Sequence, residues 1–80
     1  MELYKQVEAV ARDYLGNQAN PFLERQCRYH VGVELQDLTP EDLDSLAWWC
    51  FISGGLVIDN QKAVKFQQQI EELKEKAGAA

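Results

Sequence analysis

Residues 38–58 read LTPEDLDSLAWWCFISGGLVI, and this stretch decides the fold. It begins with the signals of a helix start. Thr39 can cap a helix, and Pro40 has no backbone N–H to leave unpaired in the first turn. The acidic residues that follow place negative charge at the positive end of the helix dipole. The sequence therefore predicts a helix from about residue 40 to the tandem glycine at 54–55.

This helix is apolar on two faces. At 100° per residue, one face carries Leu43, Leu46, Ala47, Cys50 and Gly54, and the other carries Trp48, Trp49, Ile52 and Leu56. A helix that is apolar all round is normally buried all round. Either this helix is the central rod of the domain, or its neighbours fail to cover it and the tryptophan face is an interface. We favour a homodimer whose interface residues are Trp48, Trp49, Ile52, Leu56, Phe66, Ile70 and Leu73.

The tandem glycine within the stretch has two interpretations. Gly54 and Gly55 are typical of a helix end at which one residue takes a left-handed conformation, and we favour this interpretation. The alternative is a close approach of another helix at Gly54.

Three further helices flank the central one. Apolar residues at helical spacing predict a helix over residues 2–15, closed by Gly16 in a left-handed conformation. Asn20 as the N-cap and Pro21 in the first turn predict a second helix that ends near Gly32. A seam with spacings of 3, 4, 3 and 4 predicts a last helix from residue 59 or 60 to about residue 76, with Ala63, Phe66, Ile70, Leu73 and Ala77 on its apolar face.

The predicted fold is all-α, a single small four-helix domain over residues 1–77 with antiparallel neighbours and a frayed tail at 78–80. A minority alternative is an α+β fold in which residues 31–35 pair with residues 56–58 as two short strands. One short strand without a partner is not stable, so this alternative requires both segments.

Composition and charge exclude several classes of function. The chain has 80 residues, and its 13 acidic and 8 basic residues give a net charge of -5, which opposes binding to phosphate backbones. The longest apolar run is shorter than the roughly 20 residues that a membrane-spanning helix needs. The first residues carry alternating charges, unlike a secretory signal. We therefore expect no nucleic-acid or membrane partner, and a cytoplasmic location.

The two cysteines and the single histidine are the candidates for site chemistry. Cys27 and His30 stand three residues apart on one predicted helical face, and Cys50 lies on the central helix. Three such ligands are one short of a closed zinc site, so we expect no metal, no cofactor and two buried, reduced thiols. The cysteine–histidine pair lacks a third, orienting group, so we expect no enzyme. A small-molecule or metal sensor with its site near these three residues is the alternative.

The boundary motifs carry a resemblance to a known class of module. The sequences Tyr14-Leu15-Gly16 and Pro21-Phe22-Leu23, followed by the helix start at 38–43, resemble small α-helical modules appended to bacterial signalling proteins. The resemblance covers about residues 13–58. It implies a regulatory or scaffolding role without catalysis in a bacterial cytoplasm, and it names no ligand. The predicted function is therefore a non-catalytic protein-interaction or dimerisation module that binds itself and, alternatively, another protein.

Overall fold

The computed structural model describes residues 2–78, with side chains for residues 2–76, and this part of the chain is all-α. Its α-helices are α1 (Leu3–Leu15), α2 (Ala19–Gln26), α3 (Leu43–Gly54) and α4 (Asn60–Gly78). Short 3₁₀ turns occupy Gly16–Gln18, Leu35–Asp37 and Pro40–Asp42, and a π-helical turn, Cys27–Val31, extends α2. Residues 2–78 contain no strand, so the alternative pairing of 31–35 with 56–58 is not formed there. Residues 79–80 of the predicted tail lie outside the described part.

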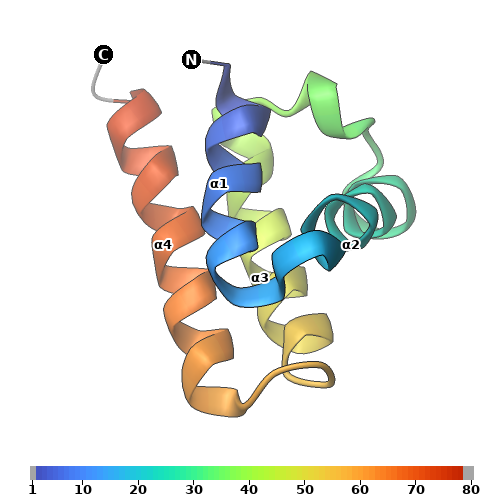
Figure 1. The fold of residues 1–80 in the computed structure, drawn as a ribbon. Helices are drawn as coiled ribbons and strands as arrows, with labels where there is room; N and C mark the ends of the chain where they lie inside the picture. Colours follow the sequence, from blue (N-terminus) through green and yellow to red (C-terminus); the bar gives the residue numbers. More distant parts are fainter. Residues whose placement is uncertain (1, 79–80) are drawn as a thin grey trace.

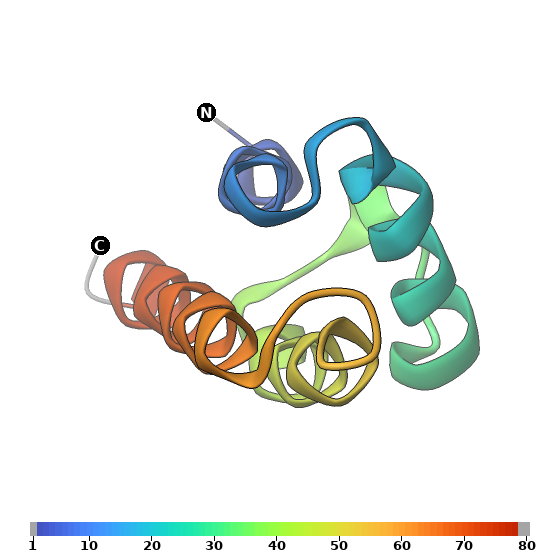
Figure 2. The same cartoon turned by 60° about the horizontal axis from the view of Figure 1, so that its bottom comes forward.

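The long helices α1, α3 and α4 lie side by side, and α2 crosses them (Figure 1). The chain runs in the same direction along α1 and α3 and in the opposite direction along α4. Figure 2 views the three long helices closer to end-on and shows α2 lengthwise beside them. The antiparallel arrangement predicted for all neighbours therefore applies to α3 with α4 and to α1 with α4, but not to α2. The cause lies in the connection, because Gly16 takes a positive φ of 58° and turns the chain sharply after α1.

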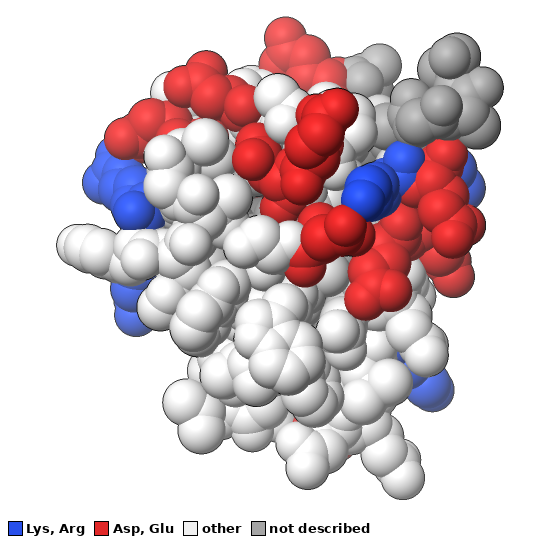
Figure 3. All heavy atoms as spheres, turned by 180° about the vertical axis from the view of Figure 1, so that it is seen from behind, with Lys and Arg blue, Asp and Glu red and all other residues white. Residues whose placement is uncertain are grey.

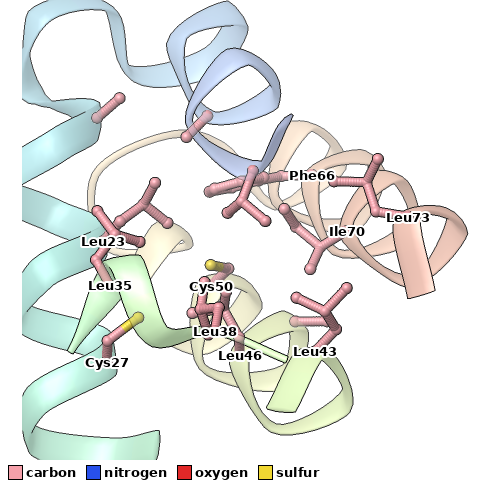
Figure 4. Packing of buried hydrophobic residues seen from close by; sticks show 14 residues of the cluster. Leu23, Cys27, Leu35, Leu38, Leu43, Leu46, Cys50, Phe66, Ile70 and Leu73 are labelled. Carbon is pink, nitrogen blue, oxygen red and sulfur yellow. The ribbon is translucent and has the colours of Figure 1, made fainter. Parts of the chain in front are cut away.

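A single ring, that of Phe66 on α4, is in contact with all three other helices. Its centroid lies 5.3 Å from that of Tyr14 on α1 and 6.2 Å from that of Phe22 on α2. Gly54 of α3 lies beside it, since a Cβ built there would stand 3.8 Å from Phe66 Cδ2. Around this ring, leucine is the most frequent residue of the core, which also includes both cysteines (Figure 4).

The start of α3 shows the predicted capping pattern, but the first turn, Pro40–Asp42, is 3₁₀ and the α-helix itself begins at Leu43. The Asp42 Oδ2 atom accepts hydrogen bonds from both the backbone N–H and the Oγ1 of Thr39, each at 3.0 Å. Leu38 and Leu43, which flank this cap in the positions of a hydrophobic staple, are both buried. The cap and the staple together fix the direction in which the chain enters α3.

The start of α2 differs from the prediction. Helix α2 begins at Ala19, so Asn20 lies inside the helix and does not cap it. The Asn20 Nδ2 atom instead donates a hydrogen bond to Glu8 Oε2 on α1. This bond joins α2 to α1. Asn20 therefore contributes to the packing of the two helices and not to the start of α2.

The tandem glycine also behaves differently from the favoured interpretation. Within residues 2–78, only Gly16 and Gly32 have a positive φ, so neither Gly54 nor Gly55 provides a left-handed helix end. Gly54 is buried as the last residue of α3 and faces Phe66. The alternative, a close approach of another helix at Gly54, is not formed either, because a Cβ built there meets only the side chain of Phe66, at an ordinary contact distance of 3.8 Å.

A pair of glycine substitutions tests this assignment. The Gly54→Ala substitution adds a methyl group at ordinary contact distance from Phe66 and reduces the freedom of the unfolded chain. We expect the free energy of unfolding to rise by about 0.5–1 kcal/mol. The matched Gly32→Ala substitution places a side chain at a φ of 91° and lowers it by about 1–2 kcal/mol. Urea denaturation measures both, and a loss in Gly54→Ala as large as that in Gly32→Ala would contradict the assignment.

The role of Phe66 is tested against Gln68 on the same helix. Phe66 is fully buried, and Gln68 is exposed. We expect Phe66→Ala to lower the free energy of unfolding by about 3–5 kcal/mol, and Gln68→Ala to change it by no more than about 0.5 kcal/mol. If the alanine variant of Phe66 does not fold, Phe66→Leu gives a smaller, measurable loss. Equal losses at residues 66 and 68 would show that the core is centred elsewhere.

Candidate interaction surface

The side of α3 that faces away from the core carries a group of exposed apolar residues. Trp48 is 51% exposed, Ile52 is 40% exposed and Leu56 is 88% exposed. Their four-residue spacing places them in one line along the helix. Gly55 keeps a right-handed helical conformation (φ −61°, ψ −17°), so the line continues to Leu56 beyond the last residue of α3.

Two further exposed valines lie near the end of α3. Val57 follows Leu56 in the turn and is exposed, and Val64 is exposed on α4. Lys74 of α4 forms an ion pair with Asp44 of α3. Because the two helices run in opposite directions, Val64, ten residues before Lys74, lies level with the end of α3. We call these five residues the outer patch: Trp48, Ile52, Leu56, Val57 and Val64.

The two tryptophans have different environments. Trp48 packs its ring against Phe51, with centroids 5.9 Å apart and planes tilted by 44°. Trp49 is half-buried, and its ring stacks on His30 of the π-helical turn at a centroid distance of 3.8 Å and an angle of 10°. Trp49 therefore contributes to the packing of the π-helical turn against α3. Of the two tryptophans, only Trp48 is part of the outer patch.

The other candidate interface residues lie inside the molecule. Phe66, Ile70 and Leu73 are buried in the core of the single chain. Three of the predicted residues therefore remain together on the surface, namely Trp48, Ile52 and Leu56. Val57 and Val64 were not among the predicted residues, because neither falls on the apolar seam of a helix. The sequence did contain an indication for Val57, because this residue lies in the apolar run that follows the tandem glycine.

Negative charge gathers at the amino-terminal end of α3. Glu41 and Asp44 are exposed there. Seen from behind, acidic side chains cover the upper part of this face and uncharged side chains cover the lower part (Figure 3). The side chains of the lower part stand out from the surface and line no deep groove. The face thus combines a charged end and an apolar end along one helix.

The candidate sensor residues are not arranged as one site. Cys27 and Cys50 are both fully buried and free, and their sulfur atoms lie in the core (Figure 4). His30 is exposed and stacks on Trp49. The predicted shared face of Cys27 and His30 is wrong, because a π turn rotates less per residue than an α-helix and carries the imidazole out to the surface. In residues 2–78, no three histidine, cysteine or acidic side chains are placed to hold a metal ion.

Burial controls the chemistry of both thiols. The pKa of Cys27 is raised from 9.0 to about 11, chiefly because burial disfavours the thiolate and also because Asp42 and Glu34 carry negative charge nearby. Burial, with a smaller contribution from Cys27, raises the pKa of Cys50 further. Both groups are therefore neutral thiols at neutral pH and poor nucleophiles.

These raised pKa values make stability depend on pH. Above about pH 9 the cysteines of the unfolded chain lose their protons, while the folded chain keeps the proton of Cys27 up to about pH 11. The unfolded state then binds fewer protons, so we expect the free energy of unfolding to fall as the pH rises from 9 to 11. Chemical denaturation at several pH values measures it. A double Cys27→Ala, Cys50→Ala variant should lose less over the same range, and identical pH dependence in the two proteins would contradict the assignment.

Comparison of the chain with family models, with curated proteins and with solved structures finds no match. Among the helices of residues 2–78, none combines the length and the apolar character needed to cross a membrane.

Proposed function

We propose that this chain is a non-catalytic protein-interaction module that associates with itself through the outer patch. The observation that carries the proposal is the half-exposed Trp48, aligned with Ile52 and Leu56 on one side of α3. Burial of a large aromatic or aliphatic side chain is worth about 1.5–3 kcal/mol, and tryptophan is enriched where binding energy concentrates. The free energy falls when another protein covers a surface with this composition.

The size of the chain supports association after folding. A compact monomer of 9.2 kDa is expected to expose about 4900 Å². The chain exposes 4969 Å², and its core is closed around Phe66 without any residue of the outer patch. The outer patch is therefore free to serve binding, because the fold does not depend on it.

The non-catalytic assignment rests on the side chains that are best suited to chemistry. The strongest nucleophiles of the chain are the two thiols, and burial keeps both of them protonated and away from solvent. The single histidine is held against Trp49 by ring stacking. Free, buried thiols also fit the reducing bacterial cytoplasm in which we place a regulatory or scaffolding role.

The proposal predicts the mass of the protein and of two variants. We expect light scattering behind size exclusion to give about twice 9.2 kDa for the unchanged chain at high concentration. The double Trp48→Ser, Ile52→Ser variant should be monomeric with unchanged helix content by circular dichroism, because neither side chain belongs to the core. Its dissociation constant should rise at least about 100-fold, as expected for two central interface residues.

Tyr29 provides the matched control. It is an aromatic residue that is 76% exposed, but it lies on the π-helical turn outside the outer patch. We expect Tyr29→Ser to dimerise like the unchanged chain. A mass of 9.2 kDa for the unchanged chain at every concentration would overturn self-association. Loss of the dimer in Tyr29→Ser alone would move the interface to the π-helical turn.

A further inference from the structure

The arrangement of the two copies follows from how charge and apolar residues divide along α3. The dimer proposed above, on which this inference rests, is expected to have twofold symmetry, so both copies use the same patch. Because the patch stands out from the surface along one helix, α3 of one copy packs against α3 of the other. Symmetry then leaves two orientations, in which the helices run parallel or antiparallel.

Charge distinguishes the two orientations. A parallel pair places the exposed Glu41 of one copy beside Glu41 of the other, while each Asp44 is paired with Lys74 of its own chain. It also sets two helix dipoles side by side in the same direction, which adds to the repulsion. An antiparallel pair centred at Ile52 moves the two Glu41 side chains to opposite edges of the interface, beyond the last residue of the partner's α3.

The spacing of the apolar residues favours the same orientation. Trp48 and Leu56 stand four residues before and after Ile52. An antiparallel pair centred at Ile52 therefore packs Trp48 of each copy against Leu56 of the other. The large ring then fills the space beside a smaller side chain. In a parallel pair, Trp48 of one copy faces Trp48 of the other, and Leu56 faces Leu56.

The area required also fits a second copy. A stable interface covers about 800 Å² on each partner, which is about a sixth of the 4969 Å² that this chain exposes. The line from Trp48 to Leu56 spans only about 12 Å at 1.5 Å per residue. A partner must therefore also reach Val57 and Val64. In an antiparallel pair centred at Ile52, each Val57 lies level with residue 47 of the other copy, and each Val64 lies close to the twofold axis because it is level with residue 54.

We infer that a second copy of this chain binds the outer patch with its α3 antiparallel to the first, across a twofold axis beside Ile52. The interface is then apolar at its centre, and the Glu41 carboxylates and the Asp44–Lys74 ion pairs lie at its two far edges. The buried thiols take no part in it.

The distance between two spin labels tests the orientation. Glu41 is exposed and lies outside the outer patch, so a nitroxide on Glu41→Cys leaves the patch intact. Residue 41 stands eleven residues from Ile52. The antiparallel dimer therefore separates the two labels by more than about 30 Å, at 1.5 Å per residue. In a parallel dimer the helix axes are about 8–10 Å apart, so the labels lie within about 20 Å of each other. Pulsed electron paramagnetic resonance distinguishes these two ranges of label-to-label distance.

Two controls keep the outcomes separate. The unchanged chain should take up no label, because Cys27 and Cys50 are fully buried. The labelled variant should remain a dimer by light scattering. A dimer with labels within about 20 Å overturns the antiparallel arrangement but leaves the proposed function standing. A chain that is monomeric at every concentration overturns both, and the outer patch then serves a different protein.

A charge variant gives a second, independent readout. In the antiparallel dimer the two Glu41 side chains are far apart, so Glu41→Gln should change the dissociation constant less than twofold. In a parallel dimer the same change removes a like-charge contact. It should then tighten the dimer several-fold at low salt and less at high salt. Tightening of this kind would overturn the inference.

Discussion

The contact of Phe66 with residues of three other helices is the interaction on which the remaining structure depends. Tyr14, Phe22 and Gly54 bring α1, α2 and α3 to the same ring. The first two contacts depend on an aromatic residue near the end of α1 and on a crossing helix, while Gly54 faces the ring at a distance that leaves room for a Cβ. Because α4 packs against α3 beside Gly54, the inner side of α3 closes completely against the core.

Because the core covers the inner side of α3, the apolar residues on its outer side are the ones that remain exposed. Helix α3 is apolar in nearly every direction, and the short helix α2 with its π-helical turn covers only the flank that carries Trp49. The opposite flank pairs with α4, and no element within residues 2–78 covers the line from Trp48 to Leu56. The exposed patch is thus a consequence of covering one apolar helix with too few neighbours in a chain of 80 residues.

Sequence reasoning correctly predicted the elements that are determined by residues close together in the chain. The capped start of α3 depends on residues within four positions of each other, and so do the long amphipathic helices. The features that it missed depend on distant partners. Asn20 bonds to Glu8 on another helix, and Gly54 faces a ring on α4. The interface residues assigned to α4 were misplaced for the same reason, since an apolar seam has the same spacing whether it faces a core or a partner.

The π-helical turn gives the second helix a property that its composition does not reveal. Gly32 donates its backbone N–H to the carbonyl of Cys27, which closes a wider loop than an α-helix allows and accommodates one additional residue. Because the wider loop absorbs this residue within one turn, the chain beyond Gly32 keeps the phase that it would have after an ordinary helix one residue shorter. The additional residue changes only the directions of the side chains within the loop, among them His30, whose ring faces Trp49. The π-helical turn therefore brings an imidazole against α3 without displacing the chain that follows.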